Sequence, residues 1–556
     1  KSQKDNMYLD LNTADLTVVG TDFVVLSDSQ RVRLYPYDKI VDINENRTIK
    51  SIGDVVVGNA DLIYGKHQFN YEEFSISIDT TDRLVFYVEE QEQFRSQTVI
   101  KRVKLKTPIE RVTGKVYIAF PGNKAGLSTN SKYPYLETTG PSYIFYEKEA
   151  LYKSAYNKDR FFFELDPFVF ENLGKTPRDN FGFPGRMVFG EIFPEVRQEA
   201  KLQEDLTLGV DIKLEDDNLP LYADRATYGG TVNFSNLGLT GSGSVDYLAA
   251  TLKSREFVFL PDSMMTQILD SVVIRKEDFN GQPYPNVVHA GIKMKWFPYR
   301  DSLMLNSRSP FAMFENKSQF VGELNLTTEG LLGNGSFLWS GANFTSDILT
   351  FDQENVYSDS LDMNIQLSER SVIKSQTDVK AEINVYDQIG LFQASPTEEK
   401  KVVRIDLPQH QYAANLDKIE WDYKSKTIRF INNNDKTNYF VSAHPDQKAL
   451  RFNLKEAVLN TEDEGLEVNI SGVPYINVAD AQIIPKGGDV TLLPNAEIEQ
   501  LTESNIVIDT VKSYHLITNA VVDIYSRTDF KATGEYLYRS ANMDDQVIVL
   551  DLIESR

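Results

Sequence analysis

The sequence contains no cysteine, which excludes disulfide bridges, thiolate catalysis and cysteine-ligated zinc. Histidine is scarce as well: the five histidines form neither an HxH nor an HExxH arrangement, so no histidine-based metal site has local support. No apolar run approaches the roughly 20 residues of a membrane-spanning helix. Any chemistry in this chain therefore depends on carboxylates, hydroxyls, amides and aromatic rings.

Positive charge is in short supply. Lys and Arg total 58 against 81 Asp and Glu, which gives a formal net charge of −23. A phosphate backbone needs a basic surface, so we expect no nucleic-acid partner, and anionic membrane surfaces are disfavoured for the same reason. The chain also lacks a GxxxxGK[ST] loop, a GxSxG elbow and a dinucleotide-type glycine fingerprint.

Helical periodicity is rare, and only residues 195–206 and 449–458 fit it. Strand signals dominate, supported by 28 Tyr and 32 Phe. Residues 75–88 predict a β-hairpin with its turn at 79–82, and residues 419–430 predict another with its turn near 424–426. We therefore expect a mainly-β, multi-domain protein of antiparallel β-sandwich or meander units with internal hairpin repeats.

β-Solenoid stacking is an alternative arrangement of these strands. Residues 495–498 and 519–522 share an Asn-Ala-x-aliphatic pattern, and their starts differ by 24 residues (519 − 495). That spacing suits one coil of a solenoid, but an ordinary antiparallel meander explains it equally well.

A glycine-punctuated segment occurs twice. Residues 230–244 and 322–336 align at a constant offset of 92 (322 − 230), and the returning strands at 257–259 and 349–351 follow the same offset. A related glycine–aromatic stretch begins at Gly534, 199 residues after Gly335 (534 − 335). Because 199 is not a multiple of 92, the pattern indicates a short strand motif placed at irregular intervals.

Composition divides the chain into four expected domains. Residues 1–107 read as an N-terminal β-rich domain, and residues 108–210 as a loop-rich and Phe-rich β domain. Residues 211–400 form the β-repeat domain, with repeat units near 230–263 and 322–354, and residues 401–556 form a C-terminal β-rich domain that could be solenoid-like. The strand-like residues 547–553 end abruptly, which suggests a longer parent chain.

The carboxylates are abundant, and no catalytic pair can be chosen among them. The acidic clusters at 215–217, 462–464 and 544–545 lie in expected turns. Residues 42–46 have the alternating oxygen ligands of a calcium loop, but Arg47 replaces the required glycine and no glutamate closes the loop. We expect no cofactor, with calcium as the one candidate ion.

An aromatic cluster lies between residues 161 and 193. It forms either a hydrophobic core or an exposed platform for a partner chain or sugar rings. The candidate interaction residues are Phe161, Phe163, Phe168, Phe170, Phe181 and Phe183.

Three phrases, at residues 159–168, 238–263 and 472–481, together resemble very large, poorly characterised envelope proteins of Bacteroidota. The resemblance covers most of residues 110–556 and implies export to the periplasm, the outer membrane or the cell surface. Residues 10–26 and 52–64 are similar in pattern to the β-layers of lipopolysaccharide-transport proteins. No catalytic residues come with either resemblance.

These observations favour a non-enzymatic, extracytoplasmic scaffold or interaction component, which presents β-faces and edges to protein partners of the cell envelope. The alternative is a polysaccharide-binding or polysaccharide-degrading protein that uses acidic residues on a β-helix or β-sandwich, with a glycan as the contact. The oligomeric state and the identity of the partner do not follow from the sequence.

Overall fold

A computed structural model describes residues 6–94, 97–147, 155–213, 219–367, 370–396, 402–433, 438–462, 466–509, 511, 515–539 and 545–555. Strands account for 64% of the chain, which confirms the expected all-β class. The chain forms two compact units. Unit 1 comprises residues 1–247, 252–268 and 297–299, and unit 2 comprises residues 248–251, 269–296 and 300–556.

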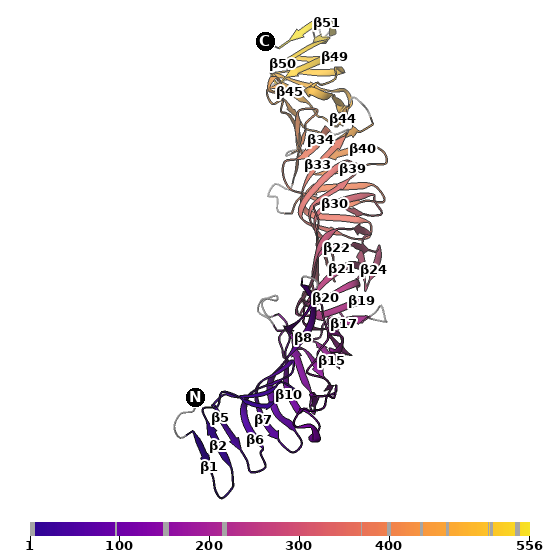
Figure 1. The fold of residues 1–556 in the computed structure, drawn as a ribbon. Helices are drawn as coiled ribbons and strands as arrows, with labels where there is room; N and C mark the ends of the chain where they lie inside the picture. The colour runs from indigo at the N-terminus through magenta and orange to yellow at the C-terminus, as the bar shows by residue number, and fades with distance from the viewer. Residues whose placement is uncertain are drawn as a thin grey trace. The chain divides into compact units, whose positions relative to one another are not determined.

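The first 22 strands lie wholly or mainly in unit 1. Figure 1 labels several of them, among them β1, β8 and β20, in the indigo to magenta part of the chain. They are β1 (Met7–Leu9), β2 (Leu16–Val19), β3 (Val24–Ser27), β4 (Val32–Pro36), β5 (Ile40–Ile43), β6 (Ile49–Val57), β7 (Ala60–Asn70), β8 (Ser75–Phe94), β9 (Gln97–Lys104), β10 (Ile109–Tyr117), β11 (Tyr135–Thr138), β12 (Ser142–Phe145), β13 (Phe161–Leu165), β14 (Val169–Phe170), β15 (Gly182–Phe189), β16 (Val196–Leu202), β17 (Leu208–Lys213), β18 (Leu219–Leu221), β19 (Ala226–Ser235), β20 (Gly238–Tyr247), β21 (Ala250–Leu260) and β22 (Ser263–Leu269).

The remaining strands lie wholly or mainly in unit 2. They are β23 (Ser271–Ile274), β24 (Glu277–Phe279), β25 (Gln282–Tyr284), β26 (Val287–His289), β27 (Ile292–Phe297), β28 (Ser302–Asn306), β29 (Phe311–Met313), β30 (Ser318–Thr327), β31 (Gly330–Trp339), β32 (Ala342–Phe351), β33 (Asn355–Leu367), β34 (Arg370–Ser375), β35 (Val379–Asn384), β36 (Ile389–Ala394), β37 (Val403–Leu407), β38 (Tyr412–Leu416), β39 (Lys418–Asp422), β40 (Thr427–Ile431), β41 (Tyr439–Ser442), β42 (Arg451–Phe452), β43 (Glu456–Asn460), β44 (Val468–Ser471), β45 (Ile476–Val478), β46 (Ala481–Ile484), β47 (Val490–Leu492), β48 (Leu501–Ile508), β49 (His515–Ser526), β50 (Asp529–Arg539) and β51 (Asp545–Glu554).

Helical structure in the described residues is limited to short 3-10 turns. They are η1 (Pro121–Asn123), η2 (Arg178–Asn180), η3 (Pro298–Arg300), η4 (Pro445–Gln447), η5 (Lys486–Gly488) and η6 (Pro494–Ala496). No helix in the described part of the chain is long and apolar enough to cross a membrane.

In unit 1, a continuous antiparallel ladder runs β2–β5–β6–β7–β8–β10–β12–β13–β15–β16–β17–β19–β20. Two long strands branch into a second layer, since β6 also pairs with β4 and β10 also pairs with β11. Burial alternates along β4, β6 and β7, as expected where one face of a sheet packs on a core. The ladder passes without a break through the expected domain boundaries at 107/108 and 210/211.

Unit 2 is built by hairpins that alternate between two layers. The long strand β33 pairs with both β34 and β35. One layer continues β34–β37–β38–β41–β42, and the other continues β35–β36–β39–β40–β43–β44–β47. Successive hairpins therefore switch layers, and rings such as Trp339 and Trp421, with centroids 5.0 Å apart, fill the core.

A separate six-stranded sheet, β45–β46–β48–β49–β50–β51, contains the last strand of unit 2. The solenoid alternative gains no support here. Each pair whose register is described is antiparallel, and Asn495 lies in η6 while Asn519 lies in β49, so the two are not equivalent rungs.

The 92-residue repeat is a structural repeat. Strands β18, β19, β20 and β21 begin at residues 219, 226, 238 and 250, and β29, β30, β31 and β32 begin at 311, 318, 330 and 342, each 92 residues later (311 − 219). Three successive left-handed residues recur as well, at 222–224 and 314–316. Gly230 pairs with Gly243, and Gly322 pairs with Gly335, whereas Gly534 pairs with Leu550. The interpretation as a short motif at irregular intervals was therefore wrong for the first two copies.

Other local predictions had mixed outcomes. The hairpin at 419–430 is confirmed by β39 and β40, and the strand at 547–553 by β51. The hairpin at 75–88 is wrong, because β8 is one 20-residue strand. Both helix predictions are wrong: residues 195–206 contain β16, and 449–458 contain β42 and part of β43.

Candidate functional site

The structure places all six candidate phenylalanines in the core of unit 1. Even the most exposed of them, Phe168, shows only 8% of its surface. Four of these rings, Phe168, Phe170, Phe181 and Phe183, form one cluster with Phe86, with Phe86–Phe170 centroids 4.7 Å apart and Phe168–Phe183 centroids 4.9 Å apart, whereas Phe161 packs on Tyr156 at 5.3 Å. This burial favours the hydrophobic-core interpretation over an exposed platform at these residues.

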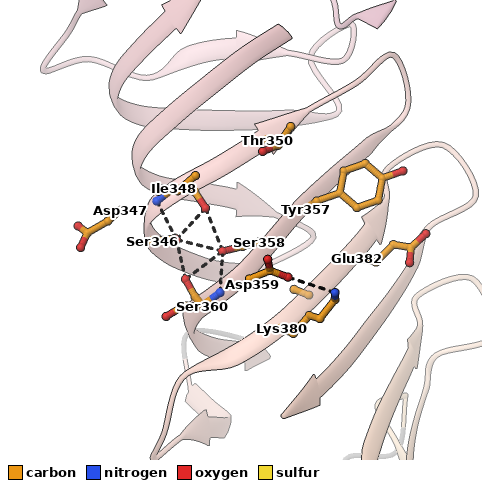
Figure 2. Close-up of a pocket in the computed structure, with 11 residues that line it drawn as sticks. Ser346, Asp347, Ile348, Thr350, Tyr357, Ser358, Asp359, Ser360, Lys380 and Glu382 are labelled. Atoms are coloured by element: carbon orange, nitrogen blue, oxygen red, sulfur yellow. Dashed lines mark hydrogen bonds and ion pairs between the residues drawn. The ribbon is translucent and has the colours of Figure 1, made fainter. Parts of the chain in front are cut away.

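An open pocket lies over β32, β33 and β35 in unit 2 (Figure 2). Its floor is a network of buried hydroxyls. The Oγ atoms of Ser346 and Ser358 lie 3.1 Å apart, and each lies within hydrogen-bond distance, 2.6–3.0 Å, of the carbonyl oxygens of Ile348 and Ser360 as possible acceptors of its one proton. The same hydroxyls accept from the backbone N–H groups of Ile348 and Ser360. Side chains thus replace part of the ladder between β32 and β33.

Unit 1 contains the same hydroxyl network 92 residues earlier (346 − 254). Ser254 Oγ lies 3.0 Å from Thr266 Oγ1, and both donate to the carbonyl oxygen of Ile268 at 3.0 Å. Their hydroxyls accept from the N–H groups of Glu256 and Ile268. Because the network recurs with the fold, we interpret it as a structural feature of the repeat.

The rim of the pocket carries three exposed carboxylates, of Asp347, Asp359 and Glu382. Asp359 forms an ion pair of 3.1 Å with Lys380. Burial raises the pKa of the Tyr357 hydroxyl to about 12, assisted by Asp352, whose carboxylate accepts its hydrogen bond at 3.1 Å. A glycosidase needs one carboxyl group held protonated by an apolar surrounding, and exposed carboxylates lack that surrounding.

Two histidines are buried and serve the fold. His67 Nε2 lies 3.2 Å from the carbonyl oxygen of Gly53, and burial lowers the pKa of His67 to about 4. His410 Nε2 contacts the carbonyl oxygen of Leu466, and burial lowers its pKa as well. Within the described residues, no group of three or more His, Asp or Glu side chains gathers as metal ligands. The calcium candidate at residues 42–46 stays an untested prediction, and the acidic residues 215–217, 463–464 and 544 lie outside the described residues.

Two pairs of aromatic rings, Phe23 with Tyr35 and Tyr37 with Tyr64, lie in β4 and β7 and in the residues next to β3 and β4. Phe23, Tyr37 and Tyr64 expose 49%, 48% and 57% of their surfaces, and Tyr35 is half-buried between them. Ring centroids lie 5.8 Å apart for Phe23–Tyr35 and 5.4 Å apart for Tyr37–Tyr64. We call these four residues the aromatic strip.

The aromatic strip was missed in the sequence, although a signal was present. Tyr35 and Tyr37 are two residues apart, which places them on one face of an extended chain. Without the pairing of β4 to β6, that face could not be assigned to solvent.

The last strand, β51, forms an open sheet edge at the end of the six-stranded sheet. Its registered partner is β50, from Lys531 opposite Glu554 to Arg539 opposite Asp545. Eight of its ten residues are exposed, among them Val547, Ile548, Val549 and Leu552 at 60%, 43%, 67% and 63%. Since neighbouring residues point to opposite faces, both faces of this strand are apolar and uncovered in the structure.

A scan against protein-family models and a search of the curated proteins gave no match to this chain.

Proposed function

We propose that the protein is a non-enzymatic scaffold or interaction component that takes up an extended strand of a partner protein along the open edge of β51. The observation that carries this proposal is the combination of a backbone edge with which no strand of the described residues pairs and exposed apolar side chains on both faces of β51. An edge of this kind is a template for strand addition, in which main-chain hydrogen bonds supply affinity and side-chain pockets supply selectivity.

The charge of β51 indicates the kind of strand that fits. Its charged residues are Asp545, Asp551 and Glu554, all acidic. Two copies of β51 would bring like charges together across the new pair, which is destabilising. A partner strand with apolar residues and basic flanks matches the edge. A second copy of β51 does not match it, because its charged residues are acidic.

The cell-envelope location belongs to the same proposal and is supported by the resemblance of three sequence phrases alone. Polysaccharide degradation is the weaker candidate, since the carboxylates of the pocket in Figure 2 are exposed.

A synthetic strand peptide tests the proposal. A labelled ten-residue peptide that alternates valine with threonine and ends in two lysines should bind the protein, and a version ending in two glutamates should not. The double substitution Val547→Lys and Val549→Lys should weaken binding of the lysine peptide roughly tenfold or more, which corresponds to about 1.4 kcal/mol.

Leu237→Lys is the matched control, because Leu237 is also 66% exposed but lies in the turn between β19 and β20. Equal binding of both peptides, or equal loss of binding in the Leu237 variant, would contradict strand addition at β51.

A further inference from the structure

The aromatic strip lies in unit 1, apart from the pocket and from β51, and the proposed function gives it no role. We propose that it is a binding platform for a neutral polysaccharide, on whose sugar rings Tyr37 and Tyr64 stack. This inference is independent of strand addition at β51.

Rigid strands hold the rings in place. Tyr35 lies in β4 directly opposite Asp54 of β6, and the backbone N–H of Tyr37 donates to the carbonyl oxygen of Ile52 at 3.0 Å. Tyr64 lies in β7 at a bulge, where the pairing with β6 is interrupted between Leu62 and Gly65, and Asp54 accepts from its backbone N–H instead. A platform preformed on a sheet loses little conformational freedom when a ligand binds.

Asp54 contacts both tyrosines, Tyr37 through its ring hydroxyl and Tyr64 through its backbone N–H. Its Oδ1 accepts from the Tyr37 hydroxyl and, at 2.9 Å, from the backbone N–H of Tyr64. Within the described residues, no hydrogen bond reaches the other carboxylate oxygen, Oδ2. The half-buried carboxylate therefore keeps an acceptor beside two exposed ring faces.

This combination matches a sugar ring, which presents C–H groups on its faces and hydroxyl donors at its edge. The C–H faces pack on aromatic rings, and a hydroxyl donates to Asp54 Oδ2. Ile52, which is 51% exposed, extends the apolar surface next to Tyr37.

A protein partner fits the strip less well. Cores of protein interfaces are depleted of charge, whereas this strip is in contact with Asp54 and with Arg33, whose guanidinium lies 5.9 Å from the Phe23 ring centroid. An apolar protein surface over Asp54 would bury its carboxylate while Oδ2 had no hydrogen-bond donor, which is energetically unfavourable. The net charge of −23 disfavours acidic polysaccharides, which leaves neutral ones.

Affinity electrophoresis tests the inference. Native gels that contain hydroxyethyl cellulose, mannan or soluble starch should retard the protein in at least one case, and a gel with alginate should not. Tyr37→Ala and Tyr64→Ala should each weaken binding roughly tenfold, and Asp54→Asn should weaken it as well, because an amide has one acceptor oxygen for the contacts with both tyrosines and with the sugar hydroxyl.

Tyr143→Ala is the matched control, since Tyr143 is a half-exposed outward ring on β12 outside the strip. Far-UV circular dichroism and the midpoint of thermal unfolding should stay close to those of the unsubstituted protein in every variant, which separates lost binding from lost folding. Absence of retardation in all three neutral gels, or self-association in sedimentation that the Tyr37 and Tyr64 variants abolish, would overturn the proposal.

Discussion

Ser346 Oγ and Ser358 Oγ lie 3.1 Å apart under the ladder of unit 2, and the hydroxyls of Ser254 and Thr266 repeat that relationship 92 residues earlier at 3.0 Å (346 − 254). Each hydroxyl both donates and accepts within its network. The two copies of the repeat therefore share the same hydroxyl contacts, although Thr266 in unit 1 corresponds to Ser358 in unit 2.

The first prediction concerns these hydroxyls. Ser346→Ala removes the acceptor of the Ile348 N–H and leaves the Ser358 hydroxyl as the one side-chain donor to the carbonyl oxygens of Ile348 and Ser360, so it should lower the free energy of unfolding by about 1–3 kcal/mol. The double substitution Ser346→Ala and Ser358→Ala should cost less than the two single costs added together, because the two hydroxyls share one network. Chemical denaturation measures both effects.

Thr266→Val tests the copy in unit 1 with a side chain of nearly the same shape, and it should be similarly destabilising. Ser425→Ala is the control, because Ser425 is exposed in the turn of the β39–β40 hairpin. Strictly additive costs at Ser346 and Ser358 would show that the network is not a unit.

The second prediction concerns the glycine pair of the repeat. Gly322 has φ +147°, and a Cβ added there would lie 2.2 Å from the carbonyl oxygen of Asn334. Gly322→Ala should therefore lower the free energy of unfolding by more than about 2 kcal/mol. Gly174→Ala, whose added Cβ meets a side-chain atom at 3.7 Å, should change it by less than about 1 kcal/mol.

The third prediction is a pH dependence at His67. Desolvation lowers the pKa of this buried histidine from 6.5 to about 4, even though Asp54 and Asp79 act in the opposite direction. The folded state therefore binds fewer protons than the unfolded state between these values. Stability contributed by His67 is present above pH 6.5 and is lost as pH falls toward about 4, by about 3 kcal/mol.

His67→Gln should reduce this acid sensitivity, since an amide can still donate to the carbonyl oxygen of Gly53 but does not titrate. The measurement is the midpoint of thermal unfolding at pH 7 and pH 4.5 for both proteins. If both lose the same number of degrees on acidification, His67 does not carry the effect.

How far the sequence predicts this fold can be seen in β8. Its polar residues 79–82 resemble a turn, but Asp79 is an extra bulged residue: Thr80 pairs with Lys66 of β7, while Ile78 pairs with the adjacent His67. A bulge tolerates exposed polar residues without reversing the chain. Local composition cannot distinguish a bulge from a turn, because the difference lies in the neighbouring strands.

The helix prediction for residues 195–206 was wrong for a related reason. Glu, Gln and Lys favour helices when nothing else decides, but β15 and β17 pair with both edges of β16 and impose an extended chain. The 92-residue offset was found in the sequence because the glycines at its close strand pairs, such as Gly230 and Gly322, are required by the backbone and recur with it. The sequence showed only part of the structural repeat, because the four strands recur at this offset even where their residues differ.

The candidate sites were less predictable than the fold. Phe161 and Phe163 are two residues apart in β13 and point to a core that only the pairing of β12, β13 and β15 creates. The exposure of Val547 and Val549 depends on β50 being the one strand that pairs with β51 among the described residues, which no local pattern encodes.

The fourth prediction tests strand addition at β51 most directly, by hydrogen–deuterium exchange of residues 545–554. The outward-facing amides of an edge strand exchange quickly, and pairing protects them. With the lysine-ended strand peptide, exchange in this segment should slow markedly, while residues 238–247 of β20, which are already paired, stay unchanged. Unchanged exchange in residues 545–554 at a saturating peptide concentration would contradict the proposed function.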